Sequence, residues 1–299
     1  MTALYTLFAL VGFAANSILC RLALQPGAID PASFTVARLA SGAIALALIV
    51  RARRRKSRGA SHAGSWGSAL LLFVYALPFS LAYVSLGVAT GALILFFCVQ
   101  ATMLVGAVVS GERIHWLEVN GIAVALAGLA HLMAPGLSAP SPEGAALMAL
   151  AGVAWGLYSL RGRRSTDAIG DTASNFARSA PMALAAFAVA APLGHLHLST
   201  HGLLLATASG VLASGAGYAA WFAALPRLNA LQAAALQLTV PLIAAVGGIA
   251  LLGEQATRRL VLSAIFILGG VGLAIGGRAL RAREAQRRAA RSAPERETS

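Results

Sequence analysis

The sequence is poor in charge and above all in acidic side chains. Of its 299 residues, 11% are charged, only ten are Asp or Glu, and 58% are hydrophobic. A water-soluble domain of this length exposes far more polar surface, because its outside faces water. The composition therefore excludes a soluble globular domain and indicates a chain that is solvated mostly by lipid.

Two further absences narrow the function. No Gly-x-x-x-x-Gly-Lys-Ser/Thr segment occurs, which excludes an ATPase that uses a Walker motif. The sequence has only two cysteines, Cys20 and Cys98, and both fall inside apolar stretches, so they offer no extracellular disulfide framework. We interpret both cysteines as packing residues.

Long apolar stretches dominate the chain. A helix that rises ~1.5 Å per residue needs about 20 apolar residues to cross roughly 30 Å of hydrocarbon. Ten stretches meet this requirement: 2–22, 32–50, 66–87, 91–110, 114–133, 144–161, 173–192, 202–224, 229–251 and 260–277. The sequence thus predicts an all-α polytopic membrane protein with ten transmembrane helices.

The few carboxylates avoid these stretches. All ten fall in predicted connections, at span ends or in the tail, and His131 is the one deeply placed candidate for a proton relay. Proton-coupled pumps usually keep an acidic or histidine relay within the membrane. We therefore expect a facilitator, with proton coupling through Glu112 or Glu254 as the alternative.

The basic residues, which give a net charge of +13, are distributed unevenly. One side of the predicted membrane holds eighteen of them: Arg51, Arg53, Arg54, Arg55, Lys56, Arg58, Arg113, Arg161, Arg163, Arg164, Arg227, Arg278, Arg281, Arg283, Arg287, Arg288, Arg291 and Arg296. The other side holds Arg21, Arg258 and Arg259. Positive residues favour the cytoplasm, so we expect both termini to be cytoplasmic. Topology and attraction to anionic lipid explain the charge without a nucleic-acid partner.

The chain also repeats itself at half its length. Gly111-Glu112 recurs as Gly253-Glu254, 142 residues later, and each pair is followed by an apolar run with small residues at matching places. Five spans per half is an odd number, so the second half enters the membrane from the opposite side. We predict a first five-helix repeat over 1–135, an inverted second repeat over 136–278 and a basic cytoplasmic tail over 279–299. Inverted repeats around a central site are typical of transporters that work by alternating access.

Several motifs occur in the order and spacing of a known family. Phe13-Ala14-Ala15-Asn16 keeps the Asn of its opening Trp-Gly-x-Asn segment, and Trp155-Gly156 keeps the Trp-Gly. The second spans each carry an intramembrane arginine, Arg38 and Arg178, and the fourth and ninth spans end in Gly-Glu. Pro241 precedes Glu254 by thirteen residues, whereas the first half has Val99 in that place. On these residues the chain resembles the drug/metabolite transporter superfamily, in its ten-span branch of two EamA-type repeats.

The resemblance covers nearly the whole chain to about residue 277. It implies a multi-pass exporter of small metabolites in the bacterial inner membrane, without a cofactor. We expect a monomer or a homodimer in contact with membrane lipid. General similarity to bacterial exporters of aromatic amino acids makes amino acids with an aromatic preference the expected cargo. Cationic drugs and nucleotide-derived metabolites are the alternative.

Candidate cargo-binding residues are the polar and aromatic side chains deep in spans 1, 3, 4, 6, 8 and 9. In the third span, Tyr75, Phe79 and Tyr83 follow each other at i, i+4 and i+8 and form one stripe. The full set is Asn16, Tyr75, Phe79, Tyr83, Phe96, Gln100, Trp155, Tyr158, Ser159, Ser214, Tyr218, Trp221 and Gln237. Rings with a few hydrogen-bonding groups suit a flat apolar body that bears a polar end. Belt or packing roles are the alternative for each ring taken singly.

The charged residues within or at the ends of spans have two interpretations each. Arg38 and Arg178 could receive a substrate carboxylate through a bidentate contact, or could snorkel and bind carbonyls at a helix end. Glu112 and Glu254 fit helix-end and gate contacts better than cargo ligands.

Other functions find less support. An intramembrane hydrolase would need a buried Ser and His in contact, and Ser214 with His131 is the one plausible pair. His195, His197 and His201 are dense enough for a metal, but no carboxylate or Cys completes a site, so none is predicted. Sequence leaves open a structural or lipid-scrambling membrane protein.

Overall fold

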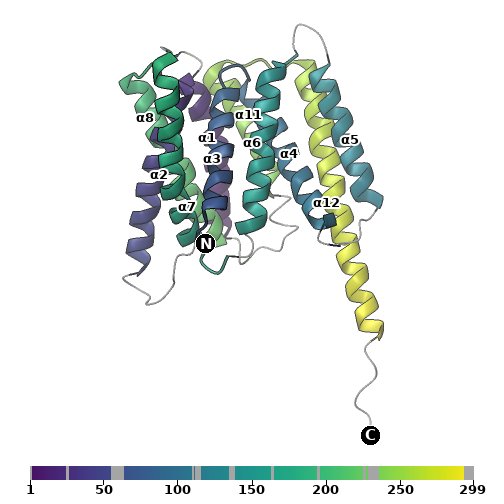
Figure 1. The fold of residues 1–299 in the computed structure, drawn as a ribbon. Coiled ribbons are helices and arrows are strands. Elements are labelled where there is room, and N and C mark those ends of the chain that lie inside the picture. Colours follow the sequence, from purple (N-terminus) through teal and green to yellow (C-terminus); the bar gives the residue numbers. More distant parts are fainter. Residues whose placement is uncertain are drawn as a thin grey trace.

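A computed structural model describes residues 2–24, 27–54, 64–109, 111, 116–134, 139–162, 165–193, 196–224, 227 and 236–292 of the chain. Every regular element among these residues is a helix, so the predicted all-α fold is confirmed. Their one β-type contact is an isolated antiparallel bridge between Ile29 and Leu198. The helices stand side by side in a bundle (Figure 1).

The helices follow the predicted apolar stretches closely. The first half contains α1 (Thr2–Leu24), α2 (Pro31–Arg54), α3 (Trp66–Ala82), α4 (Val88–Val109) and α5 (Trp116–Met133). The second half contains α6 (Pro142–Gly162), α7 (Ala168–Ala190), the 3-10 turn η1 (Ala191–Leu193), α8 (Thr200–Ala208), the π-helix η2 (Ser209–Ala216), α9 (Gly217–Ala224), α11 (Thr239–Leu252) and α12 (Arg258–Ser292). Within the predicted stretch 229–251, the described part begins at Leu236.

Local sequence explains where several of these helices start and stop. Ser65, Asp167 and Ser199 are the N-caps of α3, α7 and α8, and each side chain accepts a hydrogen bond from a backbone N–H three residues later. Pro31 and Pro142 occupy the first position of α2 and α6, where a missing N–H costs nothing. These residues place the polar helix ends at the two faces of the bundle.

Seven helical runs are long and apolar enough to cross a membrane: α1, α2, α4, α5, α6, the continuous run α8–η2–α9, and the first part of α12. The apolar helices α3 and α11 are shorter, with 17 and 14 residues. Helix α7, which contains Asp171 and Arg178, falls in neither group. Ten spans and the inverted repeat therefore stay predictions, as do the repeat boundaries.

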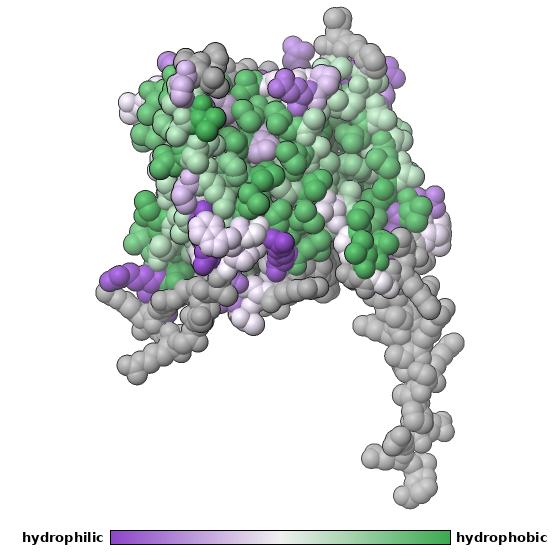
Figure 2. All heavy atoms as spheres, in the orientation of Figure 1, coloured by the Kyte–Doolittle hydropathy of each residue, from purple (hydrophilic) through white to green (hydrophobic). Residues whose placement is uncertain are grey.

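The surface is organised for lipid. Apolar side chains cover the flank of the bundle, and polar ones gather toward its two ends (Figure 2). We call the end that holds Thr2 the N-terminal end, and the end that holds Leu24 the opposite end. Helix α12 extends beyond the bundle on the side where the N-terminus lies (Figure 1).

Helices α5 and α12 form a closely packed pair at one edge of the bundle (Figure 1). At their crossing, Gly121 and Gly270 face each other so closely that a Cβ on either would collide with the backbone of the other helix. Small residues let membrane helices approach in this way, where van der Waals contact holds them together.

The run from α8 to α9 contains the main irregularity of the fold. From Ser209 to Ala216 the helix widens to π geometry, and the N–H of Gly217 donates to the carbonyl of Leu212, five residues earlier. Residues five apart lie on nearly the same face of a π turn, whereas in an α-helix they point well apart. Such insertions occur frequently at functional sites. This one faces the centre of the bundle.

Candidate functional site

A small cavity lies at the centre of the bundle, between helices of both predicted halves. Helices α1, α3 and α4 come from the first half, and α6, η2 and α9 from the second. The lining residues are Phe13, Asn16, Ser17, Tyr75, Phe79, Leu95, Phe96, Trp155, Ala213, Ser214 and Tyr218. The cavity volume is about 20 Å³, which is room for one water molecule. The structure is therefore closed around this centre.

Aromatic rings make up much of the cavity wall. The ring centroid of Trp155 lies 4.9 Å from that of Tyr75 and 5.1 Å from that of Tyr218. Tyr75 packs in turn on Phe79 at 5.3 Å, and Phe13 meets Tyr218 edge to face at 5.7 Å. These separations are those of favourable aromatic pairs. A flat ring of similar size can take part in the same kind of contact.

A polar cluster stands behind these rings, with Arg38 at its centre. The Arg38 side chain is fully buried. Its Nε donates to Ser214 Oγ at 3.2 Å, and its Nη2 donates to the Tyr75 hydroxyl at 3.1 Å. The guanidinium also lies 5.1 Å from the ring centroid of Tyr75 and 5.2 Å from that of Phe79. Arg38 thus contacts two residues that line the cavity.

Asn16 extends the cluster to α1 and η2. Its Nδ2 donates to the Tyr75 hydroxyl at 3.2 Å, and its Oδ1 accepts from Ser209 Oγ at 2.6 Å. The π geometry of η2 directs both Ser209 and Ser214 to this cluster, because they are five residues apart. Ser209 was not predicted from the sequence, since α-helical spacing places it on a different face from Ser214.

The Arg38 charge has no carboxylate partner among the described residues. Its Nη1 is buried and makes no hydrogen bond there. The only ion pair found in the described part of the chain joins Arg53 and Asp167, elsewhere in the bundle. Buried charges in proteins are normally paired, because removing one from water costs several kcal/mol. An unpaired buried guanidinium beside a cavity can receive an anion.

The second intramembrane arginine has a different environment. Arg178 is half-buried, and its Nη1 donates to Ser174 Oγ at 2.7 Å. Its guanidinium lies 5.9 Å from the ring of Trp66, at the start of α3. The two arginines, which were predicted to have the same roles, therefore differ, since Arg38 is central and Arg178 reaches toward the N-terminal end.

Seven of the thirteen predicted cargo-binding residues line the cavity: Asn16, Tyr75, Phe79, Phe96, Trp155, Ser214 and Tyr218. The other six, which do not line it, are Tyr83, Gln100, Tyr158, Ser159, Trp221 and Gln237. Trp221 packs on Phe13, and Tyr158 stacks on Trp155, each directly behind the wall. Ser159 donates to the carbonyl of Trp155 within its own helix. Four lining residues were not predicted: Phe13, Ser17, Leu95 and Ala213.

At the opposite end, two charged residues hold the turn between α3 and α4. The Glu254 carboxylate accepts from the N–H of Val88 at 2.7 and 3.0 Å, and so caps α4. Arg21 donates from Nη1 to the carbonyls of Tyr83 and Val84, at 2.8 and 2.9 Å. The turn is thus fixed from α1 on one side and from the end of α11 on the other. Glu112, the counterpart of Glu254, lies outside the described residues.

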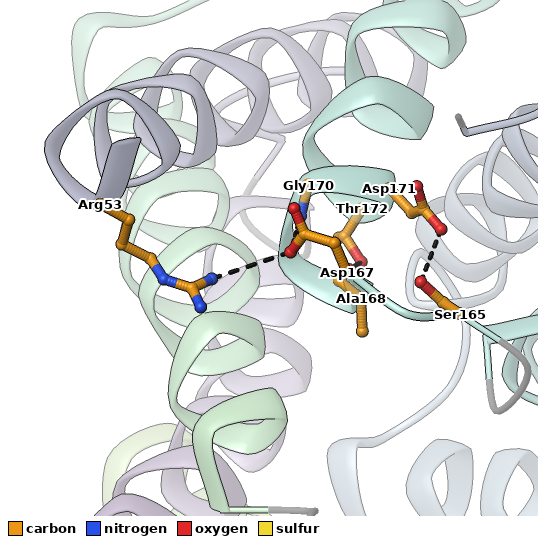
Figure 3. A network of polar contacts seen from close by, with 7 residues as sticks. All are labelled: Arg53, Ser165, Asp167, Ala168, Gly170, Asp171 and Thr172. Carbon is orange, nitrogen blue, oxygen red and sulfur yellow. Dashed lines mark hydrogen bonds and ion pairs between the residues drawn. The ribbon is translucent and has the colours of Figure 1, made fainter. Parts of the chain in front are cut away.

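At the N-terminal end, polar contacts join the starts of α3 and α7 to the end of α2. Asp171 accepts from Ser165 Oγ at 2.6 Å, and Arg53 of α2 lies 3.9 Å from Asp167 (Figure 3). Asp171 also accepts from the N–H of Gly64 at 3.1 Å. A wider groove of about 730 Å³ opens between α1, α2, α7 and α9 beside the Arg53–Asp167 pair.

Ser214 and His131, the pair considered for a hydrolase, do not contact each other. Ser214 is buried at the cavity, whereas His131 is exposed on α5, which packs mainly on α12. No group of three or more His, Cys, Asp or Glu side chains suited to a metal ion occurs in the described part of the chain. His195 lies outside that part. Bundle and cavity together define the class as a multi-pass helical membrane protein with a small central cavity.

Comparisons with known proteins identify the family. Residues 142–276 match the model of the EamA-like transporter family. Over 281 residues the chain is 48% identical to the uncharacterized protein PA1977 of Pseudomonas aeruginosa, covering 94% of this chain and 96% of that relative. A solved structure, described as the crystal structure of a protein, aligns with 91% of this chain and 97% of its own, at a TM-score of 0.64 and 21% identity.

The chain belongs to the EamA-like transporter family. Membership indicates a membrane transporter of small solutes, and the family is one of transporters and not of enzymes. The likeness to the solved structure shows that the fold is shared.

Proposed function

We propose that this protein exports small metabolites across the inner membrane by alternating access, and that amino acids with aromatic side chains are its preferred cargo. The observation that carries this proposal is the ring-lined cavity, where Tyr75, Trp155 and Tyr218 from both predicted halves meet beside a buried arginine. Transporters built from two halves bind their cargo between those halves, near the membrane midplane.

Different cavity residues contact the aromatic ring and the polar end of the cargo. Trp155 and Phe79 offer apolar faces to an aromatic side chain, at the separations that favour ring pairs. Ser214 and Tyr75 offer hydroxyls, with Arg38 directly behind them. A substrate carboxylate placed at these hydroxyls faces the guanidinium. The same positive charge disfavours a cationic drug, which was the alternative cargo.

The small size of the cavity supports alternating access. A volume of about 20 Å³ is far below the roughly 300 Å³ or more of a typical ligand pocket, so cargo enters only after the helices separate. Two sets of contacts resist that separation. Glu254 and Arg21 hold the opposite end, while Asp171 joins α3 to α7 at the N-terminal end. Transport requires that one set opens while the other stays closed.

The distribution of charge supports a facilitator with both termini in the cytoplasm. Apart from Arg38 and Arg178, described arginines lie toward helix ends, and the N-terminal end holds Arg51, Arg53, Arg161 and Arg227. No carboxylate lines the cavity, so cargo would move down its own gradient. Proton coupling through Glu254 is the alternative, since this carboxylate lies at one of the two closed ends.

Counterflow in liposomes tests cargo and coupling together. Purified protein is reconstituted, loaded with one amino acid and given labelled tryptophan, tyrosine, phenylalanine, alanine or lysine, with and without a pH gradient. We expect the three aromatic amino acids to exchange fastest and the pH gradient to leave their accumulation unchanged. Accumulation that follows the gradient would replace the facilitator with a proton-coupled exporter.

Two variants link the activity to the cavity. Trp155→Ala removes the ring that contacts Tyr75 and Tyr218. Aromatic exchange should therefore fall by ~5- to 30-fold, from the ~1–2 kcal/mol that an aromatic contact and its buried area contribute. Trp116→Ala is the matched control, because Trp116 is 65% exposed on α5. Equal exchange by the two variants, both normally inserted, would remove Trp155 from the pathway.

A further inference from the structure

The central site contains more hydrogen-bond donors than acceptors. Arg38 carries five N–H groups, of which Nε and Nη2 reach Ser214 and Tyr75 while Nη1 has no partner among the described residues. Asn16 uses its amide nitrogen as a further donor to Tyr75. Its amide oxygen, an acceptor, is already bonded to Ser209. The polar cluster therefore has more donors than acceptors before any cargo binds.

Two of the four hydroxyls that line the cavity, those of Tyr75 and Ser214, also have more donors than acceptors around them. The Tyr75 oxygen accepts from both Arg38 and Asn16, and the Ser214 oxygen accepts from Arg38. Each hydroxyl must then direct its own hydrogen elsewhere. Tyr218 brings a further hydroxyl to the same cavity wall, and two neighbouring hydroxyls need only one hydrogen between them. At least one hydrogen from the tyrosines, and that of Ser214, is left for an acceptor in the cavity.

Nothing in the cavity balances the charge of Arg38. Its lining residues are aromatic, aliphatic, hydroxyl or amide side chains, and none is acidic. The rings of Tyr75 and Phe79 lie 5.1 and 5.2 Å from the guanidinium. Cation–π contacts of this kind stabilise a cation only partly, by less than its loss of hydration costs. The remaining requirement is for negative charge with lone pairs.

We infer that this site selects cargo by a carboxylate attached to an aromatic body, and that it offers an α-ammonium group no ionic partner. The inference rests on the proposed transport function and narrows its cargo class. Aromatic monocarboxylates without an amino group, such as aryl-substituted propionates and 2-oxo acids, present lone pairs to the hydroxyls of Tyr75 and Ser214 and a negative charge to Arg38 directly behind them. An aromatic amino acid presents the same carboxylate, but its ammonium meets ring faces and no carboxylate in the lining, and cation–π contact repays only part of its lost hydration. Deaminated acids therefore belong to the cargo and bind at least as tightly as the corresponding amino acids.

Three ligands of one shape separate the two charged groups. Phenylalanine carries both, 3-phenylpropionate carries only the carboxylate, and 2-phenylethylamine carries only the ammonium. Binding is measured at pH 7.4 by isothermal titration calorimetry on the full chain in nanodiscs, which avoids passive leakage of the weak acid and base. We expect 3-phenylpropionate to bind at least as tightly as phenylalanine. The amine should bind ~10- to 100-fold more weakly, as expected for the loss of a hydrogen bond to a charged group.

Substitutions at the donors show which groups read the carboxylate. Arg38→Gln should remove the difference between the acid and the amine. Because replacing a fully buried side chain can also unfold the protein, Tyr75→Phe and Ser214→Ala are tested in parallel. Each should weaken both carboxylates by ~5- to 10-fold and leave the amine unchanged, as the loss of one hydrogen bond predicts. Ser68→Ala is the matched control, since this hydroxyl pairs with Ser65 near the start of α3.

Two outcomes would overturn the inference: tight binding of the amine at the level of the acid, or binding of phenylalanine more than tenfold tighter than of 3-phenylpropionate. The second would show that an unrecognised group receives the ammonium. Counterflow of phenylalanine is measured on the same preparations. Normal counterflow with the wrong order of affinities rejects only the charge selection, whereas binding in the expected order without counterflow rejects transport.

Discussion

Removing the carboxylate of Glu254 should loosen the opposite end of the bundle. Both carboxylate oxygens accept from the N–H of Val88, so Glu254 acts as an N-cap supplied by a distant part of the chain. Loss of an N-cap costs ~0.5–2 kcal/mol, and loss of a negative charge at a helix N-terminus costs ~0.3–1 kcal/mol. For Glu254→Ala we expect the sum, about 1–3 kcal/mol. Glu254→Gln retains one acceptor oxygen and should lose about half as much.

The measurement is amide hydrogen exchange across the turn between α3 and α4, on protein in nanodiscs. A local opening that becomes easier by about 1–3 kcal/mol raises the exchange rate by roughly 5- to 150-fold. Arg21 still binds the carbonyls of Tyr83 and Val84 in this variant, so α3 should keep its protection. Glu143→Ala is the control, because Glu143 is an exposed acidic residue in the first turn of α6. Unchanged exchange at Val88 in Glu254→Ala would refute the capping role.

Two more substitutions test how the bundle is held together. Gly121→Val should destabilise the α5–α12 pair by about 1–3 kcal/mol or more, because its side chain meets the backbone at Gly270. Gly272→Val points into open space and should leave the thermal midpoint in detergent unchanged. Equal midpoints for the two variants would contradict this packing. Asp30 accepts from Ser33 N–H at 2.9 Å and from His197 N–H at 3.2 Å, so Asp30→Ala should cost about 1–3 kcal/mol. Asp167→Ala loses an exposed ion pair of 3.9 Å and a cap hydrogen bond, and should cost less, about 1 kcal/mol. A larger loss of unfolding free energy in Asp167→Ala than in Asp30→Ala, measured by denaturant unfolding, would show that this ranking is wrong.

Much of the site was accessible from helical spacing. The i, i+4, i+8 rule placed Tyr75, Phe79 and Tyr83 in one stripe, and their rings do contact one another in sequence, tilted and then edge to face, with centroids 5.3 and 4.8 Å apart. The rule could not predict which of the three rings line the cavity. Tyr83 lies beyond its wall and directs its hydroxyl to the carbonyl of Val88, because α3 ends at Ala82.

Other features depended on contacts between distant segments. The π geometry of η2 has no signature in the local pattern of small residues, yet it decides that Ser209 and Ser214 share a face. Arg38 and Arg178 look equivalent in the sequence, and only the neighbours supplied by other helices distinguish them. The capping of α4 by Glu254 joins residues 166 apart.

The sequence by itself determined the solvent and the secondary structure of this protein. Long apolar runs in a chain with few charges have no stable arrangement except as helices in lipid, since every backbone group must be bonded within its own segment. Tertiary structure alone decided which polar side chains meet. Burying Arg38 without a carboxylate, beside Tyr75 and Ser214, is a property of three helices and not of any one, because a charge is unpaired only with respect to everything packed around it.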